Sequence, residues 1–471
     1  MQHKSAYVWG LLGRFAPQSI HLITTMILAR CLTPEDYGKI GVLAIIFTVA
    51  NVLLDAGLGG SLVKEKKLTP VDCSTIGFFN LIVSAVIYTI LFVSADYVEA
   101  YFEIDDLSSI LRYISLVFPF TALGIVPKAL LNRKLAFKET FYNSIVGVIV
   151  ASIVSIIMAF NGCGVYSLVA YQVVVESVTV LCNCITAKYV ILLQFSFASL
   201  KRLLPFGLFT SMITIIDTVY GNLMTVLLGK YLTVQQAGYM SQAQRIEGVS
   251  ASSIASAINI VSFPIMTKLK DDKSSFEKEA MSTITMIASF SFPLLVTIAV
   301  FAKEVLMILL GSQWVDASEY LQVLSFAGMF IIIEALVRNF VKSLCEVKKL
   351  LYATILKRVV GICIIIVSFF ISTSGVVYGY LVSSIVGFSI NLFLYTRLMN
   401  ISANKIVLRV IMIMLPNLLY FAFMFLIGFT FLNNEIVRVL LAVVILSLIY
   451  LLYLPLLGVN IIDYIKNFIR K

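Results

Sequence analysis

Long apolar stretches separated by short polar connections dominate the chain. Fourteen stretches of about 18–25 residues are long enough to cross a bilayer core of about 30 Å as helices. Few charged residues interrupt them, so the pattern predicts an all-α polytopic membrane protein with about 14 transmembrane helices. The predicted spans are 8–30, 40–62, 73–94, 110–131, 141–160, 164–187, 203–229, 246–266, 281–302, 319–340, 350–371, 375–397, 407–431 and 435–456.

The charges between the spans predict the topology. Of the 35 Lys and Arg residues, 27 lie at the termini or in every second connection, for example in Arg338–Arg358. An acidic loop, Asp96–Asp106, lies in the other set of connections. Because cytoplasmic loops carry an excess of Lys and Arg, the cation-rich connections and both termini are predicted to be cytoplasmic. The net charge of +10 is therefore a topology signal and a source of contact with anionic membrane lipids, and it does not indicate nucleic-acid binding.

Composition agrees with a membrane protein and gives little sign of an enzyme. Hydrophobic residues make up 60% of the chain, charged residues make up 13%, and the mean hydropathy is +1.00. A soluble domain has roughly 25% charged residues. The seven Cys lie mostly in apolar stretches and the chain has two His, so we expect packing cysteines and no metal site. No phosphate-binding loop and no nucleophile–base pair stand out. We therefore expect no cofactor, and any energy input comes from an H⁺ or Na⁺ gradient or from the membrane potential.

The chain contains an internal repeat. The segments Leu28–Ile40 and Leu228–Met240 share two Leu, a Thr and a Gly at equivalent positions. Spans 1–6 therefore resemble spans 7–12, and because six is even the two copies have the same orientation, as in a parallel repeat. We predict two six-helix lobes, 1–200 and 201–400, followed by 401–471 with two more helices and an amphipathic cytoplasmic tail. Further matches pair Leu111 with Leu321, Lys138 and Tyr142 with Lys348 and Tyr352, and Gly164 with Gly375.

Polar side chains inside the spans indicate faces that turn away from lipid. A charge at the bilayer centre costs about 2.5–3.5 kcal/mol on insertion scales, so it should face a cavity or a partner. In the first span Arg14, Gln18, His21 and Thr25 share one helix face. The matching face of the seventh span carries threonines, with Asp217 beside it. The other candidates are Asn51, Asp55, Glu176, Arg245, Asn259, Glu334 and Arg338.

Purely structural interpretations of these residues stay open. A long cation near a span end can snorkel to the headgroups, a histidine can be packed, and neighbouring opposite charges can satisfy each other. These interpretations apply to Arg14 and Arg245 (span ends), to His21 (packing), to Asp55 and Asp217 (capping or pairing within a lobe), and to Glu334 with Arg338, spaced i, i+4.

Several segments together resemble one family of carriers. The chain is similar to Wzx-type exporters of polysaccharide and lipid-linked oligosaccharide, in the oligosaccharidyl-lipid flippase superfamily, near the colanic acid and teichuronic acid exporters. In the second copy Val234–Ala237 replaces the Pro-Glu-Asp-Tyr of the first, which suggests a structural turn whose Gly ends the connection. The segments that carry the resemblance are Leu11–Ile20, Leu28–Gly38, Asp55–Val63, Leu130–Lys138 and Val261–Leu269.

The resemblance implies a flippase in the bacterial inner membrane. Its substrate would be an undecaprenyl-pyrophosphate-linked oligosaccharide, a unit of O-antigen, capsule or exopolysaccharide, moved to the outer leaflet by alternating access. A polysaccharide polymerase and other assembly proteins would be its partners. The implied substrate-binding residues are Arg14 and Arg245 for the pyrophosphate, Lys128 and Arg338 at the cytoplasmic entrance, and Gln18 and His21 in the cavity. The implied ion-coupling residues are Asp55, Glu176, Asp217 and Glu334.

Three alternatives stay open. A cation-coupled multidrug and toxin extrusion antiporter would have twelve spans and a cavity dominated by carboxylates. A lipid II flippase would also have fourteen spans. A membrane-bound polymerase or ligase would need a large outer loop with catalytic residues, whereas the longest outer loops here have about 15–17 residues.

Overall fold

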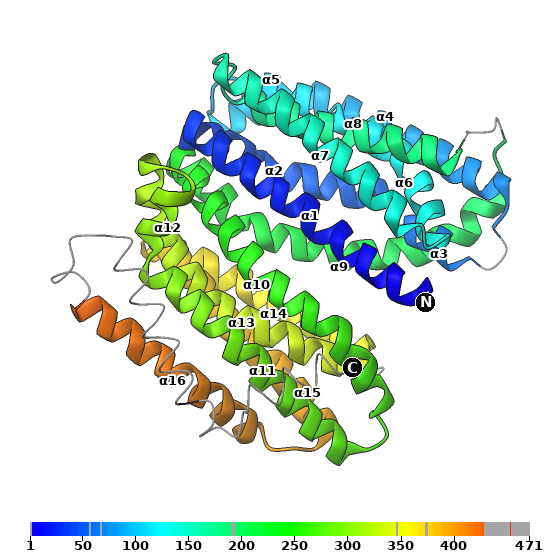
Figure 1. Ribbon diagram of the computed structural model, residues 1–471. Coiled ribbons are helices and arrows are strands. Elements are labelled where there is room, and N and C mark those ends of the chain that lie inside the picture. The colour runs from blue at the N-terminus through cyan, green and yellow to red at the C-terminus, as the bar shows by residue number, and fades with distance from the viewer. Residues whose placement is uncertain are drawn as a thin grey trace. The chain divides into compact units, whose positions relative to one another are not determined.

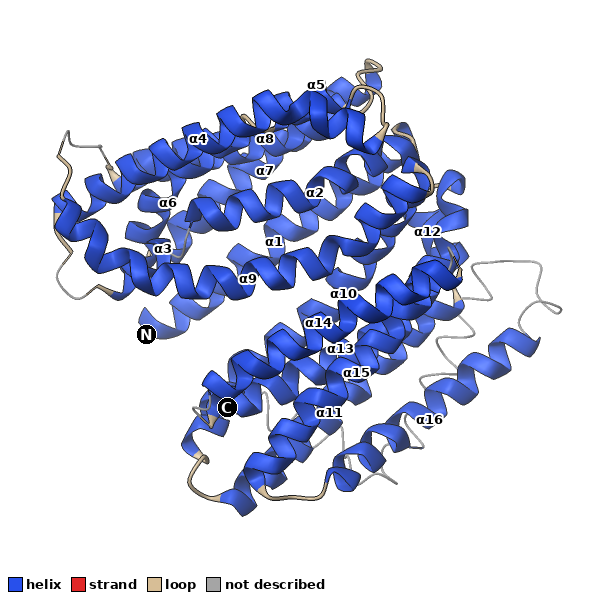
Figure 2. Ribbon diagram, turned by 180° about the vertical axis from the view of Figure 1, so that it is seen from behind, coloured by secondary structure: helices blue, strands red, loops and turns tan. Residues whose placement is uncertain are grey.

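A computed structural model describes residues 2–55, 58–65, 68–189, 194–344, 347–372 and 375–427, and Tyr453. All secondary structure in these ranges is helical (Figures 1 and 2), which confirms the predicted all-α class. The helices are α1 Gln2–Cys31, α2 Pro34–Asp55, α3 Leu58–Lys64, α4 Pro70–Phe102, α5 Leu107–Ile114, α6 Val117–Arg133, α7 Phe137–Phe160, α8 Tyr166–Ala187, α9 Phe197–Tyr231, α10 Val234–Lys268, α11 Lys273–Val300, α12 Ala302–Leu309, the 3₁₀ helix η1 Ser312–Ala317, α13 Ser318–Ser343, α14 Val347–Ile371, α15 Gly375–Met399 and α16 Ala403–Ile427.

The helices agree with the predicted spans as far as the structure describes them. Eleven of the first thirteen spans each fall on one helix, and the second and fourth spans each fall on two, α2 with α3 and α5 with α6. Among the described residues, ten helical segments are long and apolar enough to cross a membrane, so the chain is a multi-pass membrane protein. The other long helices, α1, α9 and α10, contain stretches of side chains outside the described set. Apart from Tyr453, the fourteenth span and the tail also lie outside it.

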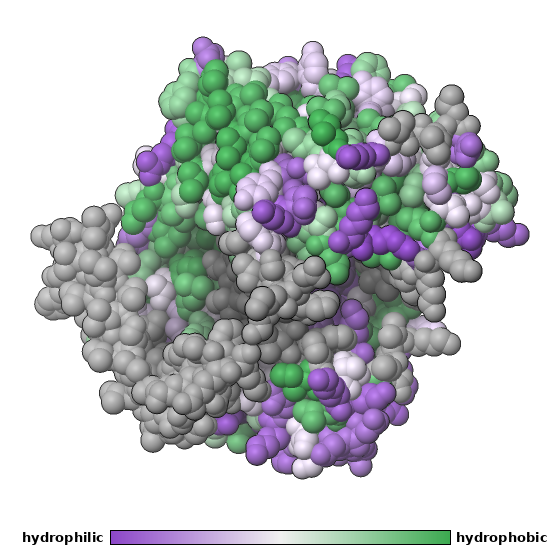
Figure 3. Space-filling view, turned by 45° about the vertical axis from the view of Figure 1, so that its right-hand side comes forward, coloured by the Kyte–Doolittle hydropathy of each residue, from purple (hydrophilic) through white to green (hydrophobic). Residues whose placement is uncertain are grey.

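The surface of the helices is suited to lipid. Large apolar side chains are strongly exposed, among them Ile185 at 77%, Phe370 at 81% and Ile371 at 80%. Figure 3 shows broad apolar areas in green, with polar side chains gathered in separate patches. Apolar patches of this kind on a helical bundle indicate membrane contact.

The chain divides into two compact units. Unit 1 comprises Met1–Ser241 and Leu309–Gln313, and unit 2 comprises Gln242–Ile308 and Trp314–Lys471. In unit 1, α6 and α7 both pack along α8, α1 packs along α7, and α9 packs along α2. In unit 2, α13 and α14 both pack along α15, and α11 packs along α13 and α16. Each unit therefore contains a trio in which two helices pack on a third, α6–α8 in unit 1 and α13–α15 in unit 2.

Helix α9 belongs to unit 1, although the repeat begins its second copy there. It contacts α2, α3 and α4, and the division between the units falls within α10. The predicted lobe boundary at residue 200 follows the repeat in the sequence, whereas the units follow packing. The two boundaries therefore describe different properties of the chain.

The two repeated turns pack against each other through their glycines. A Cβ on Gly38 would lie 1.9 Å from the carbonyl oxygen of Val234, and a Cβ on Gly238 would lie 1.9 Å from that of Pro34. Such distances leave no room for any side chain, so both positions require Gly. The expectation that this Gly ends the connection was wrong, because Gly38 and Gly238 lie inside α2 and α10. The repeated glycine allows the backbones of the two turns to pass each other in close contact.

Side chains fix the first of these turns. Thr33 and Asp36 form a reciprocal capping arrangement, in which the Thr33 amide donates to the carboxylate at 2.9 Å and the Asp36 amide donates to Thr33 Oγ1 at 3.2 Å. Gln313 Nε2 donates to the carbonyls of Ala29 at 2.6 Å and Leu32 at 2.8 Å. These bonds satisfy backbone groups that a helix end leaves without partners, and they hold the end of α1 and the start of α2 in place.

Candidate functional site

Unit 1 contains a polar cavity of about 660 Å³. Its walls come from α2, α3, α6, α7 and α8. Three predicted site residues line it together: Asp55, Lys128 and Glu176. Amide and hydroxyl groups complete the polar lining, namely Asn51, Thr121, Asn132, Thr140, Ser144, Thr179 and Asn183.

The charged groups in the cavity interact across its walls. Glu176 on α8 is partly buried and lies close enough to the Thr121 side chain and to Lys128 to interact with both electrostatically. Lys128 on α6 is exposed. Asp55 ends α2, and its Oδ1 accepts a hydrogen bond from the Gly59 amide at 3.3 Å. The cavity therefore offers one cation, two carboxylates and many uncharged donors and acceptors to a bound molecule.

Glycines set the distances between the helices around this cavity. A Cβ on Gly124 of α6 would lie 2.5 Å from Val180 Cγ2, and one on Gly147 of α7 would lie 2.0 Å from Thr179 Oγ1. Both partners are on α8. Small residues of this kind let membrane helices approach closely, so these two glycines hold α6 and α7 against α8.

Arg133 fixes the wall formed by α3. Its Nη1 donates to the carbonyls of Leu62 at 3.2 Å and Val63 at 3.5 Å, and also to that of Glu65. A guanidinium that satisfies several carbonyls at a helix end is stabilising there. Arg133 therefore supports the cavity, since Val63 lines it.

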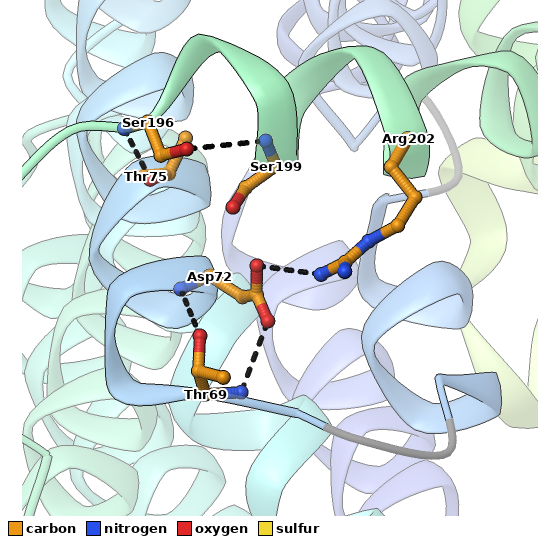
Figure 4. Close-up of polar contacts among 6 residues, drawn as sticks. All are labelled: Thr69, Asp72, Thr75, Ser196, Ser199 and Arg202. Carbon is orange, nitrogen blue, oxygen red and sulfur yellow. Dashed lines mark hydrogen bonds and ion pairs between the residues drawn. The ribbon is translucent and has the colours of Figure 1, made fainter.

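A second polar network joins the starts of α4 and α9 (Figure 4). Asp72 is 1% exposed, accepts from Arg202 Nη2 at 2.7 Å, and forms a capping box with Thr69. The Ser196 amide donates to Thr75 Oγ1 at 3.0 Å. This network was not predicted from the sequence, although a Thr followed three residues later by an acid is a capping-box signal. The network fastens α9 to α4 within unit 1.

The polar face of α1 is described only in part. The side chain of Arg14 lies outside the described residues, and Gln18 is partly buried. The His21 ring stacks on Tyr171 of α8 with centroids 4.7 Å apart. This geometry supports the packing interpretation of His21, while its role in substrate binding stays a prediction. Asp217 lies partly buried in α9, also in unit 1.

Glu334 pairs with a residue of the next helix. Lys357 Nζ donates to Glu334 Oε1 at 2.6 Å, and Asn391 Nδ2 donates to the same oxygen. The structural pairing with Arg338, one of the interpretations that the sequence left open, is therefore not the one that the structure shows. Lys357 is also not in a cytoplasmic connection, because it lies inside α14 and is 4% exposed. Spacing along one helix favoured Arg338, whereas helix packing brings Lys357 to the carboxylate.

The remaining candidates belong to unit 2. Arg338 lies partly buried in α13, one turn after Glu334, and Arg245 lies partly buried in α10. The cavity of unit 1 therefore gathers four candidates whose side chains the structure describes: Asn51, Asp55, Lys128 and Glu176.

Comparison with known proteins places this geometry in context. A family model described as "Polysaccharide biosynthesis protein" matches residues 27–319. An uncharacterised membrane protein of the cps region of Klebsiella pneumoniae is 22% identical over 76% of this chain and 77% of that protein. The succinoglycan biosynthesis transport protein ExoT of Rhizobium meliloti is 24% identical over 68% of this chain and 65% of its own length. The lipopolysaccharide biosynthesis protein WzxC of Escherichia coli is 23% identical over 68% of this chain and 66% of its own length.

Solved structures support the fold. The lipid II flippase MurJ in an inward closed conformation superposes with a TM-score of 0.76 at 16% identity, over 95% of this chain and 98% of that one. An inward-facing multidrug resistance MATE family transporter gives a TM-score of 0.62 at 17% identity, over 83% and 99%. At these identities the likeness concerns the fold alone.

Proposed function

This chain belongs to the polysaccharide biosynthesis protein family, and we propose that it moves a lipid-linked oligosaccharide from the cytoplasmic to the outer leaflet of the bacterial inner membrane. It shares a transporter fold with a flippase, and a relative is a transport protein. It is accordingly a membrane carrier and not an enzyme. The substrate, its direction of movement and the cytoplasmic position of both termini are part of the proposal.

The observation that carries the proposal is the polar cavity of unit 1. Sugar hydroxyls and a pyrophosphate cannot cross hydrocarbon without partners, because each unsatisfied polar group costs several kcal/mol there. A cavity of about 660 Å³ lies in the range of ligand sites, about 300–1,000 Å³. Its amides and hydroxyls suit sugar hydroxyls, and Lys128 supplies the positive charge that a phosphate needs. The prenyl chain can stay in lipid beside the apolar helix surfaces.

The proposed mechanism divides the work among the charged residues. Lys128 binds the pyrophosphate as a point charge, with Arg14, Arg245 and Arg338 as further cations on its route. Because the cell interior is negative, outward movement of an anion gains about 2.3 kcal/mol per charge per 100 mV. The carboxylates of Asp55, Glu176 and Asp217 are the proposed places for coupling to an H⁺ or Na⁺ gradient, and that of Glu334, which is paired with Lys357, is proposed for coupling to H⁺.

The test uses purified protein in liposomes that contain a prenyl-pyrophosphate-linked oligosaccharide. The readout is the fraction of this lipid that becomes accessible on the far leaflet with time. We expect Lys128→Ala to slow transfer at least tenfold and Lys128→Arg to retain most of it. The control is Lys134→Ala, because Lys134 is an exposed lysine at the end of the same helix and does not line the cavity. Equal rates for Lys128→Ala and Lys134→Ala would remove Lys128 from the mechanism.

A second function is favoured by the carboxylates of the same cavity. Asp55 and Glu176 outnumber Lys128 among its charged groups, and two carboxylates can bind an organic cation, as a cation-coupled multidrug antiporter requires. The same liposomes, loaded with a fluorescent organic cation under a proton or sodium gradient, separate the two functions. Cation transport without lipid transfer would replace the flippase proposal.

A further inference from the structure

The repeat allows equivalent positions in the two helix trios to be compared. The trio α6–α8 of unit 1 corresponds to α13–α15 of unit 2, both in sequence and in packing. Positions in α13 and α14 follow their partners by 210 residues, as Leu321 follows Leu111, and positions in α15 follow by 211, as Gly375 follows Gly164. These offsets pair Gly124 with Glu334, Gly147 with Lys357, and Val180 with Asn391.

The two trios use these positions in opposite ways. In unit 1 the glycines let α6 and α7 lie directly against α8, and Gly124 faces Val180. In unit 2 the same three positions hold a carboxylate, an ammonium and an amide that contact one another. A close apolar contact in one copy thus corresponds to a charged cluster in the other.

The cluster in unit 2 is almost completely shielded. Glu334 is 8% exposed, Lys357 is 4% exposed and Asn391 is 0% exposed. Replacing a buried ion pair by apolar residues of similar size is often neutral or stabilising. Fold stability alone therefore does not explain three polar residues at positions where the first copy has glycine and valine.

One polar atom of this cluster, Asn391 Oδ1, has no hydrogen-bond partner within the described part of the chain. Asn391 Nδ2 donates to Glu334, but its Oδ1 is buried and accepts no hydrogen bond within the described part of the chain. An unsatisfied buried acceptor is destabilising, because it has lost its hydrogen bonds to water. Carboxylate and amide oxygens are the ligands that hard cations prefer. A carboxylate and a spare amide oxygen side by side are therefore suited to a small cation.

We propose that Glu334 and Asn391 form a site suited to a monovalent cation in unit 2, and that the ammonium of Lys357, paired with Glu334, takes the place of that cation in the native protein. One carboxylate balances one positive charge, and Lys357 Nζ supplies it at 2.6 Å. The cations Arg338 and Arg358 act on Lys357 electrostatically, which disfavours a divalent ion. Because the lysine occupies the site, the native protein needs no Na⁺ there. The site does not depend on which substrate the carrier moves.

Removal of the lysine side-chain charge tests the proposal. Lys357→Met keeps the length of the apolar stem and leaves Glu334 without its ammonium. Melting curves of the purified full chain in detergent are compared in NaCl and in choline chloride at equal ionic strength. We expect the native protein to melt at the same temperature in both salts. Lys357→Met should melt several degrees lower in choline chloride than in NaCl. Its melting temperature should rise with Na⁺ concentration until the site is saturated.

Two control variants make the result specific. Lys349→Met removes an exposed lysine from the same helix and should respond to neither salt. Lys357→Met combined with Glu334→Gln should lose the Na⁺ response, because the charged ligand is gone. If Lys357→Met does not fold, Lys357→Gln replaces it, since an amide can still donate to Glu334. Identical melting of the folded single variant in both salts, or a Na⁺ response that survives Glu334→Gln, would overturn the proposal.

Discussion

Substitution of Gly38 and Gly238 by alanine tests how much the close contact between the two repeated turns contributes to stability. Each new methyl group would lie 1.9 Å from a backbone carbonyl oxygen of the opposite turn. A backbone atom cannot swing aside as a flexible side chain can. The turns must therefore separate by about 1.5 Å to restore ordinary contact, in a region whose atoms are closely packed.

The expected cost follows from this displacement. Overpacking of a well-packed contact costs about 1–3 kcal/mol, and each 1.4 kcal/mol is about tenfold in the folding equilibrium. Alanine itself gains about 1 kcal/mol over glycine inside a helix, so a helical glycine without this contact is the right reference. Gly248→Ala in α10 is that reference, because its Cβ would meet nothing within 4 Å. Relative to it, Gly38→Ala and Gly238→Ala should each lower the free energy of unfolding by about 1–3 kcal/mol.

The double variant distinguishes one shared contact from two separate ones. A single separation of the turns relieves both clashes, so Gly38→Ala with Gly238→Ala should cost little more than either change alone. The assay is a denaturant titration of the detergent-solubilised protein, followed by thiol labelling of Cys73, which is buried in unit 1. The reasoning would be refuted if either single variant had the same free energy of unfolding as Gly248→Ala. It would also be refuted if the double variant lost as much stability as the two single variants added together.

Three further predictions concern charged residues. Asp72→Ala should cost about 1–3 kcal/mol in the same titration, because it removes both a cap and an ion pair, whereas Arg202→Ala should cost less; equal costs would contradict the capping role. The hydrogen bond and charge of Lys230 lower the pKa of Glu103, so the stability from this pair is present above about pH 4.3 and is lost as the pH falls through the lowered pKa. The melting-temperature difference between native protein and Glu103→Gln should therefore vanish in acid, and a difference that grows there would contradict this. Glu176→Gln should abolish any effect of an imposed proton or sodium gradient on lipid transfer in liposomes, and a retained effect would exclude Glu176 from coupling.

The sequence predicted the helices well, because they are written in long, regular patterns. An apolar stretch of twenty residues has few alternatives to a spanning helix in lipid. Asp55 and Glu176 were also named as candidates, because a charge in such a stretch stands out, and Lys128 was named through the family resemblance. Their meeting in one cavity depends on how α2, α6 and α8 pack, and no single stretch of sequence contains that information.

The ion pair of Glu334 with Lys357 shows what the sequence did not reveal. Within one helix the i, i+4 rule makes Arg338 the natural partner of Glu334. The actual partner, Lys357, comes from the next helix and was counted with a run of cytoplasmic cations. The close contact at Gly38 and Gly238 likewise appeared in the sequence only as a repeated glycine. From the sequence alone, Gly38 could equally have ended a turn. In both cases the deciding fact is a distance between helices.

The two copies of the repeat have the same arrangement of helices, but their equivalent positions carry different residues and can therefore have different roles. Both trios hold two helices against a third, but the first closes the contact with Gly124 and Gly147 and keeps a solvent-accessible lysine in the cavity beside it. The second uses its lysine internally, against Glu334. A lysine that is already neutralised by a buried carboxylate offers little attraction to a phosphate. Of these two lysines, Lys128 in unit 1 is therefore the one that we propose for binding an anionic substrate, although both belong to equivalent trios of the repeat.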